Sequence, residues 1–226
     1  AHEGIWLKDS TDSHELRGKT LGIIGYGNIG SQVSVLAESM GMKVIFYDTE
    51  TKLPLGNAES KNSMKEVMKL SDIITLHVPD LPSTRNMITR DNLKFCKKTA
   101  ILINYARGKV VDLEALKNAL ENNELGGAAI DVFPEEPVKT GDKFITPLQG
   151  LNNVILTPHI GGSTEEAQQN IGEDVSNKMF NFLEKGITTG SHTVPPLNRP
   201  PHETSPRILH SHNNVPGVLS QINARL

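Results

Sequence analysis

An arginine, several carboxylates and a histidine follow short apolar runs in the middle and later parts of this 226-residue chain. Arg107 follows the run at 100–104, and His159 follows the run at 153–158. Asp131 lies within the run at 128–133, and Glu135 and Glu136 follow that run. If the runs are parallel strands, their carboxyl ends meet at one edge of a sheet, where ligands bind in open α/β folds. We therefore expect these side chains to converge.

The convergent groups suit one kind of chemistry. A guanidinium can hold a carboxylate in a bidentate fork, and a histidine can exchange a proton with a hydroxyl group. A carboxylate on the second imidazole nitrogen would orient the ring and raise the histidine pKa. Beside a bound dinucleotide, such a set favours hydride transfer between a 2-hydroxy acid and a 2-oxo acid. Each residue alone more often serves a surface ion pair or a turn, so the prediction depends on their occurring together.

A glycine motif supplies the expected dinucleotide site. The stretch TLGIIGYGNIGS contains Gly25, Gly27 and Gly30 in the spacing G-x-G-x-x-G, between an apolar run and a helical pattern. The three glycines permit a tight turn, close approach of the backbone to a pyrophosphate, and close helix–strand packing. Asp48 ends the next apolar run and can accept hydrogen bonds from both ribose hydroxyls. Its charge would repel a 2′-phosphate, so NAD is favoured over NADP.

The elements that carry these residues alternate in type. Six short runs rich in Val and Ile span 21–25, 43–48, 72–78, 100–104, 128–133 and 153–158. They are too continuous to be half exposed, which favours central parallel strands. Helical patterns lie between them, so the sequence predicts an α/β fold: a doubly wound parallel sheet of the Rossmann type.

Two of the helical patterns can be assigned faces. Ile29, Val33, Leu36 and Met40 fall on one face of a helix that Gly41 ends. In the second pattern Asp112 is a natural N-cap, and three leucines are expected to face inward: Leu113, Leu116 and Leu120.

Composition excludes several classes of protein. The net charge of −3 comes without a basic stripe, which argues against a nucleic-acid partner, and no apolar run is long enough to span a membrane. The single cysteine, Cys96, excludes an internal disulfide framework and favours a reducing compartment, the cytoplasm. His210 and His212 have the spacing of metal ligands on a strand, but no other cluster completes a site, so we expect no metal.

The domain plan has five expected parts. They are an N-terminal arm (1–18), an NAD-binding domain (19–162), a long amphipathic helix (163–185), a linker rich in Pro, Ser and Thr (186–206), and the start of a small module (207–226). The chain begins without Met and stops within an apolar pattern, so we expect a fragment at both ends.

The motifs GIIGYGNIG, LHVP, NYARG, AAIDVFPEEP and LTPHIGGSTEEAQ resemble the D-isomer-specific 2-hydroxyacid dehydrogenase family, over nearly the whole chain. Within that family the resemblance implies the branch that oxidises 3-phospho-D-glycerate to 3-phosphohydroxypyruvate, the first step of L-serine biosynthesis, with 2-oxoglutarate reduction as a side activity. It implies a homo-oligomer and catalytic roles for Arg107, Glu136 and His159. It also implies cofactor contacts at Asn28, Ile29, Asp48, Val78, Tyr105, Ala106, Arg107, Asp131, Gly161 and Gly162.

The final segment, RILHSHNNVPGVLSQIN, resembles the opening of an ACT domain, a small α+β regulatory module. That resemblance implies serine as an effector, with His212 and Asn214 as its ligands and with Pro216 and Gly217 in the turn before a helix. It also implies that the helix at 163–185 returns to a substrate-binding half that is absent here, as are the basic residues for a substrate phosphate.

Two other functions remain open. Another D-2-hydroxyacid dehydrogenase, such as a glyoxylate or hydroxypyruvate reductase, would use the same three groups. A redox-sensing corepressor, which presents a protein-binding surface when NAD is bound, would also keep them. The ACT-like terminus argues against both.

Overall fold

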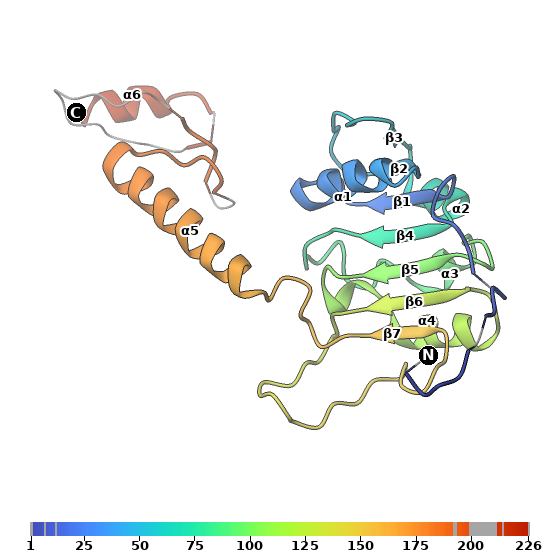
Figure 1. The fold of residues 1–226 in the computed structure, drawn as a ribbon. Helices are drawn as coiled ribbons and strands as arrows, with labels where there is room; N and C mark the ends of the chain where they lie inside the picture. The colour runs from blue at the N-terminus through green and yellow to red at the C-terminus, as the bar shows by residue number, and fades with distance from the viewer. Residues whose placement is uncertain are drawn as a thin grey trace. The chain divides into compact units, whose positions relative to one another are not determined.

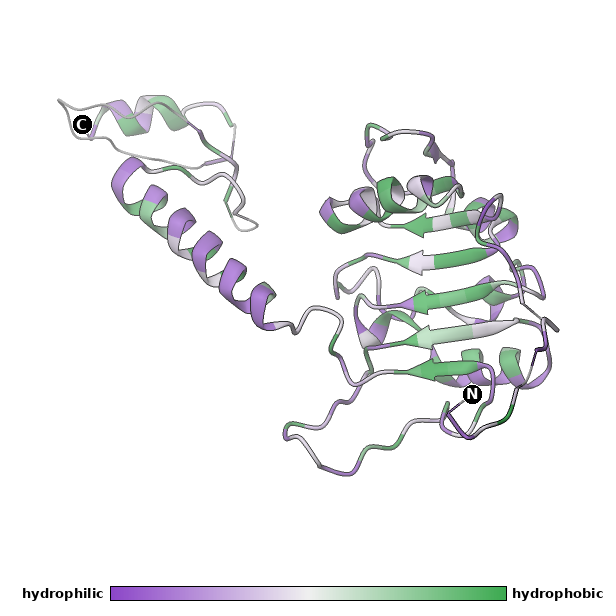
Figure 2. Cartoon of the chain, viewed as in Figure 1, coloured by the Kyte–Doolittle hydropathy of each residue, from purple (hydrophilic) through white to green (hydrophobic). Residues whose placement is uncertain are grey.

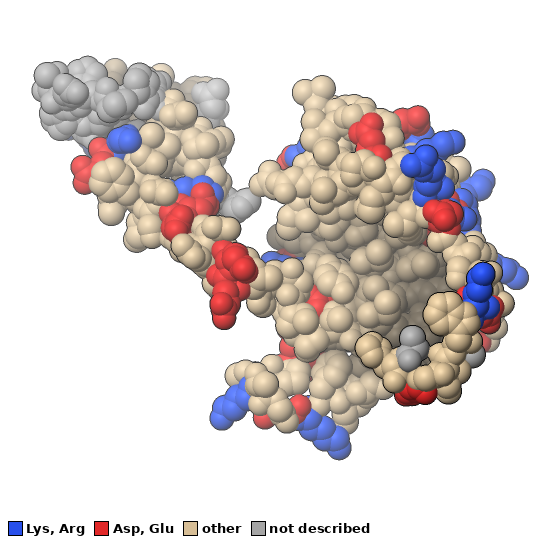
Figure 3. All heavy atoms as spheres, viewed as in Figure 1, with Lys and Arg blue, Asp and Glu red and all other residues tan. Residues whose placement is uncertain are grey.

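A computed structural model describes residues 2–6, 8–11, 13–191, 194–198, 212–213 and 215–225. The chain divides into two compact units, residues 1–161 and 162–226. The six apolar runs predicted as strands and the candidate catalytic residues lie in the first unit. In the view of Figure 3, the charged side chains of this unit lie mainly around the rim of the face.

The first unit is built on a seven-stranded sheet of order β3-β2-β1-β4-β5-β6-β7, in which every neighbouring pair is parallel (Figure 1). The strands are β1 (Thr20–Ile24), β2 (Lys43–Tyr47), β3 (Glu59–Ser60), β4 (Ile73–Leu76), β5 (Ile101–Asn104), β6 (Gly127–Ile130) and β7 (Val154–Leu156). Six of them are the predicted runs, and the two-residue edge strand β3 was not predicted. The doubly wound parallel sheet is confirmed.

Short helices connect the strands. They are α1 (Asn28–Ser39), α2 (Met64–Leu70), α3 (Arg90–Leu93), the 3₁₀ helix η1 (Gly108–Val110) and α4 (Leu113–Glu121). The strands carry largely hydrophobic residues (Figure 2), and Ile23, Ile74 and Leu102 in their centres are fully buried. A sheet buried on both faces explains why the runs show no alternation of polar and apolar residues.

The predicted face is correct for α4. Asp112 caps this helix by accepting hydrogen bonds from the backbone nitrogens of Glu114 and Ala115. The three predicted leucines, Leu113, Leu116 and Leu120, are all buried.

The apolar face of α1 is not the buried one. Ile29, Leu36 and Met40 are exposed, whereas the buried residues of the helix are Gly30, Ser34 and Ala37. The helix ends as predicted, with Gly41 at a φ of +79°. Of the predicted face, only Val33 is partly buried and packs against the core. Mainly small residues therefore face the sheet on this side, and Ile29, Leu36 and Met40 face away from it.

The second unit contains α5 (Glu165–Lys185) and α6 (Val218–Asn223). Helix α5 is amphipathic as predicted but has no buried residue. The segment after it folds back on itself, since the backbone nitrogen of Thr188 donates to the Leu197 carbonyl at 2.9 Å. Gly217 has a φ of +90° at the N-terminus of α6, which agrees with the predicted turn. Residues 199–211 and Asn214, which precede that turn, lie outside the described residues.

Candidate active site

Arg107 leaves the carboxyl end of β5 and precedes η1. Its guanidinium is exposed, with one nitrogen 2.6 Å from the carbonyl oxygen of Ala106. Position 108 requires a glycine because the backbone at Phe133 and Pro134 lies very close to it, not because of its φ. An added Cβ would overlap the Phe133 carbonyl group and lie 2.5 Å from the Pro134 nitrogen. The ends of β5 and β6 therefore meet directly beside the arginine.

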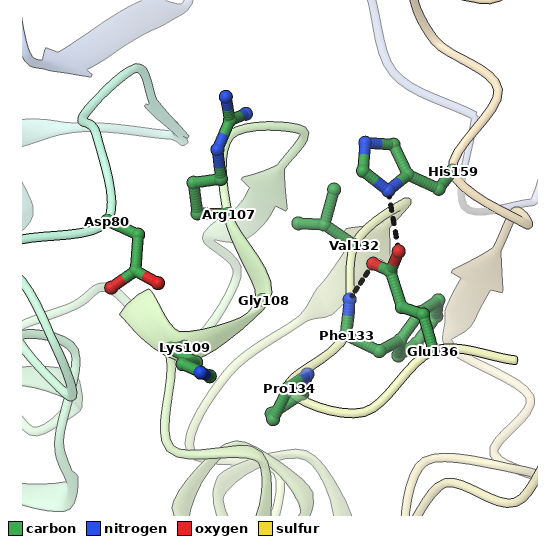
Figure 4. A pocket seen from close by; sticks show the side chains of 9 residues that line it. All are labelled: Asp80, Arg107, Gly108, Lys109, Val132, Phe133, Pro134, Glu136 and His159. Carbon is green, nitrogen blue, oxygen red and sulfur yellow. Dashed lines mark hydrogen bonds and ion pairs between the residues drawn. The ribbon is translucent and has the colours of Figure 1, made fainter. Parts of the chain in front are cut away.

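His159 and Glu136 lie within hydrogen-bonding distance of each other, the arrangement expected for a histidine oriented by a carboxylate. His159 Nδ1 lies 2.7 Å from Glu136 Oε2, while Glu136 Oε1 accepts a hydrogen bond from the backbone nitrogen of Phe133 at 2.8 Å. Figure 4 shows the carboxylate between the imidazole ring and that nitrogen. Because both of its oxygens are engaged, the carboxylate holds the ring in one orientation. Glu135 is exposed beside it.

The loop that carries His159 is fixed by a buried carboxylate. Asp131 Oδ1 accepts hydrogen bonds from the Thr157 hydroxyl at 2.6 Å and from the Ile160 nitrogen at 3.1 Å. Asp131 Oδ2 accepts from the Gly161 nitrogen at 3.0 Å. Burial pushes the Asp131 pKa upward, but these hydrogen bonds outweigh it and hold the pKa below its usual value. Asp131 thus lies behind the histidine and stabilises its loop.

The backbone of His159 is itself unusual, with a φ of +55°. A non-glycine residue rarely adopts this left-handed conformation, and it costs of order 1–3 kcal/mol when the surroundings enforce it. The hydrogen bonds that the backbone nitrogens of Ile160 and Gly161 donate to the Asp131 carboxylate provide that enforcement. Such conformations concentrate at functional sites.

These side chains line one open pocket of about 230 Å³. Besides Arg107, Glu136 and His159, its lining includes Asp80 and Lys109 (Figure 4). Asp80 is paired with Arg85 at 2.7 Å, and its pKa is lowered by that hydrogen bond, by the charge of Arg85 and by the nearby charges of Lys109 and Arg107. Both carboxylates of the pocket therefore have partners. Lys109 and Arg107 have no carboxylate within ion-pair distance among the described residues.

The glycine motif forms a cradle at the N-terminus of α1. Gly25 has a φ of +93°, and a side chain there would overlap the His77 carbonyl. A Cβ on Gly30 would overlap the Gly25 carbonyl oxygen, so this glycine allows close packing as predicted. Gly27 has open space around it and no side chain caps the helix. The backbone N–H groups and the positive end of the helix dipole are thus available to an anion such as a pyrophosphate.

The other predicted cofactor residues lie around this cradle and the pocket. Asp48 follows β2, and its two oxygens accept hydrogen bonds from the backbone nitrogens of Tyr26 at 2.7 Å and Glu50 at 2.9 Å. Val78 follows β4 and lies against Gly25. Ala106 is buried beside Arg107.

Tyr105 and Gly161 lie together at the other end of the predicted cofactor site. The Tyr105 hydroxyl lies 3.2 Å from the Thr157 hydroxyl, and a Cβ on Gly161 would lie 2.8 Å from the Tyr105 ring. At the edges of the predicted set, Asn28 and Ile29 open α1, and Gly162 begins the second unit.

Several residues of the site were not predicted. Thr157 and Lys109 are adjacent to predicted residues, so their strand-end position was a usable signal. Asp80 enters the pocket from a loop after β4, which no spacing rule indicates.

In the described part of the chain no group of His, Cys, Asp and Glu could hold a metal ion, and no helix is long and apolar enough to span a membrane.

Comparison with known proteins agrees with this geometry. Residues 1–161 match the family described as D-isomer specific 2-hydroxyacid dehydrogenase, NAD binding domain. This chain belongs to that family. The Rossmann-type sheet lies in the part of the chain that matches the family's NAD binding domain, and the pocket described above lies at the carboxyl edge of that sheet.

Family members with similar sequences include D-3-phosphoglycerate dehydrogenases. The protein from Haemophilus influenzae is 54% identical over 222 residues, which are 98% of this chain and 54% of that protein. The protein from Escherichia coli (strain K12) is 49% identical over 223 residues, which are 99% of this chain and 54% of that protein. The chain therefore spans about half the length of these relatives.

Solved structures of the family share the fold. An NAD-complexed D-isomer specific 2-hydroxyacid dehydrogenase from Lactobacillus delbrueckii ssp. bulgaricus superposes with a TM-score of 0.71 at 34% identity, covering 81% of this chain and 58% of that chain. D-lactate dehydrogenase from Aquifex aeolicus, complexed with NAD and lactic acid, gives a TM-score of 0.68 at 32% identity. The match covers 80% of this chain and 58% of that chain.

Proposed function

We propose that the protein containing this chain oxidises 3-phospho-D-glycerate to 3-phosphohydroxypyruvate with NAD, the first step of L-serine biosynthesis. The observation that carries the chemistry is the His159–Glu136 pair at 2.7 Å in the same pocket as Arg107. The choice of substrate is supported by the relatives named D-3-phosphoglycerate dehydrogenase at 54% and 49% identity.

The residues present fit NAD. The cradle at Gly27 and the uncapped start of α1 suit the pyrophosphate. Asp48 keeps unused lone pairs on both oxygens for the two ribose hydroxyls, and its charge disfavours a 2′-phosphate. Tyr105 and Ala106 then line the nicotinamide end, next to Arg107. When bound, NAD supplies the acceptor for the hydride.

The chain's own residues carry the rest of the reaction. Arg107 holds the substrate carboxylate in a bidentate fork and fixes the hydroxyl carbon beside it. His159 takes the hydroxyl proton at Nε2 as the hydride leaves that carbon, because Nδ1 faces Glu136. Glu136 accepts the Nδ1 hydrogen bond and stabilises the imidazolium that forms. Asp131 keeps the loop of His159 in place and does not touch the substrate.

Lys109 supports a substrate with two anionic groups. Arg107 and Lys109 line the same pocket without a carboxylate partner among the described residues. A phosphorylated hydroxy acid supplies one anion for each cation, whereas lactate supplies only one. The likeness to D-lactate dehydrogenases keeps another 2-hydroxy acid as the second candidate.

The test is turnover by the complete protein. Reduction of phosphohydroxypyruvate by NADH should fall by roughly 10²–10⁴-fold in Arg107→Ala and His159→Ala, and Glu136→Gln should also lose activity. Glu135→Gln is the matched control and should keep the wild-type rate, because the Glu135 side chain is exposed and does not line the pocket. Wild-type rates in the first three variants would contradict the assigned roles. A protein that binds NADH but reduces no 2-oxo acid would instead indicate a corepressor.

The remaining expectations stay with this proposal. We propose a cytoplasmic homo-oligomer with the five-part domain plan, in which the module at 207–226 binds serine through His212 and Asn214. The unit boundary between residues 161 and 162 agrees with a change of domain there. Inhibition of the complete protein by serine, lost in His212→Ala, tests the effector site.

A further inference from the structure

Tyr26 holds both ends of the segment that follows β2. Its backbone nitrogen donates to Asp48 Oδ2 at 2.7 Å, and its hydroxyl oxygen accepts a hydrogen bond from the backbone nitrogen of Leu55 at 3.1 Å. The same hydroxyl lies 2.8 Å from Ser34 Oγ in helix α1. One residue within the glycine motif therefore connects the acid after β2, the segment beyond it, and the helix.

The direction of each hydrogen bond follows from counting donors. The Ser34 hydroxyl donates its proton to the Ser31 carbonyl at 2.7 Å. The proton between Ser34 and Tyr26 must then come from Tyr26, while the Tyr26 oxygen accepts from Leu55. The phenol thus uses its donor and one acceptor, and it is only 3% exposed. Such a fully satisfied buried group restrains all of its partners.

The ring of Tyr26 has a separate task. It stacks on Phe46 with centroids 3.8 Å apart and planes 17° apart. A phenylalanine could make the same stacking contact in the same core. The hydroxyl is therefore the part of Tyr26 that packing does not explain.

We propose that Tyr26 is a positioning residue for the adenosine half of NAD, acting through Asp48 and residues 49–55. This inference rests on the proposed NAD-dependent function. Asp48 keeps lone pairs for the ribose only in the orientation that the Tyr26 and Glu50 nitrogens impose. The segment that starts at Asp48 keeps its course only if its far end, Leu55, is also fixed. The Tyr26 hydroxyl is what fixes that end.

The experiment compares ligands that fill different halves of the site. Tyr26→Phe in the complete protein removes the hydrogen bonds to both Leu55 and Ser34. It should bind NADH and ADP-ribose about three- to tenfold more weakly, the range expected when one of them, the bond to Leu55, supports the adenosine half of the site. Nicotinamide mononucleotide should bind as it does to the wild type. In turnover, the KM for NAD should rise by a similar factor, while kcat and the KM for the acid substrate stay unchanged.

Two further variants make the result decisive. Tyr47→Phe is the matched control, because the Tyr47 hydroxyl makes no hydrogen bond within the described residues, and it should bind all three ligands normally. Ser34→Ala removes only the partner in α1 and should weaken NADH and ADP-ribose by a smaller factor. If Tyr26→Phe does not fold, the Ser34→Ala variant replaces it in these binding measurements.

Three results would overturn the proposal. They are wild-type affinity of Tyr26→Phe for ADP-ribose, equal weakening of nicotinamide mononucleotide, and a raised KM for the acid substrate. If the wild type itself bound no NADH, the proposed function would fail as well. That outcome is distinguishable because it does not depend on any substitution.

Discussion

Helices α1 and α4 both look amphipathic in the sequence, yet they pack against the same sheet in opposite ways. Helix α4 buries Leu116 and Leu120, as its pattern predicts. Helix α1 instead buries Gly30 and Ser34 and exposes Leu36. The hydrophobic pattern thus identified two helices correctly, but it identified the buried face of only one.

The difference in the buried face follows from the structure at the N-terminus of each helix. Helix α4 begins at a side-chain cap, Asp112, and its buried face combines the three leucines with Ala115 and Ala119. Helix α1 begins at the glycine turn, where an added Cβ on Gly30 would overlap the Gly25 carbonyl. The largest side chains cannot enter so close an interface, so Ile29, Leu36 and Met40 lie on the outer face. Helix α1 is therefore held near its strand by small residues.

The largest expected effect comes from the same substitution in the two helices. Leu116→Ala should lower the free energy of unfolding by about 2–5 kcal/mol, because it leaves a cavity at a fully buried position. Leu36→Ala should change it by less than about 0.5 kcal/mol, since this side chain is 61% exposed. Both changes alter helix propensity equally, so urea unfolding isolates the packing difference. Equal costs would show that α1 also uses its apolar face in the protein.

A second pair of variants separates close packing from ligand approach within α1. Gly30→Ala should lower the free energy of unfolding by about 1–3 kcal/mol, as overpacking does. Gly27→Ala should leave stability almost unchanged, because its Cβ would enter open space.

The same two variants should rank differently in a binding assay. Gly27→Ala should weaken NADH binding, since the added methyl group would occupy the space reserved for the pyrophosphate. Calorimetry with NADH, beside thermal unfolding, provides both readouts. The idea fails if Gly27→Ala loses stability while retaining NADH affinity.

The parts of the fold that could be predicted share a physical cause. Strands buried on both faces leave continuous apolar runs, so six strands were predicted, and the side-chain cap at Asp112 placed the start of α4. Strand β3 has two exposed residues, Glu59 and Ser60, and leaves no such trace. The buried face of α1 was missed because close approach selects small residues, which hydrophobic periodicity does not register.

The candidate site was predictable where it depends on strand ends. Arg107, Asp131 and His159 follow neighbouring strands of a parallel sheet, so their convergence follows from topology alone. The Glu136 contact required the turn after β6, and the choice between Glu135 and Glu136 came from family resemblance. Asp80 and the hydroxyl of Tyr26 depend on tertiary contacts that no local pattern encodes.

The smallest expected effect is a pH dependence on the α1 side of the sheet, through His77 at the end of β4. Burial lowers the His77 pKa below its ordinary value of about 6.5. The unfolded chain therefore takes up a proton at His77 before the folded one does, and folding stability falls as the pH drops through about 6.5. Above that range the residue is neutral in both states and contributes no slope.

His77→Gln should remove this part of the pH dependence. Between pH 7.5 and 5.5 the wild type should lose up to about 1 kcal/mol more unfolding free energy than the variant, as measured by urea titration. Between pH 7.5 and 8.5 the difference between the two proteins should stay constant.

The His77 carbonyl lies directly against the turn at Gly25. Protonation of His77 should therefore also loosen the start of α1. As the pH is lowered, NADH affinity should fall more steeply in the wild type than in the variant. If NADH affinity depended on pH in the same way in both proteins, the charge on His77 would have no effect on the turn.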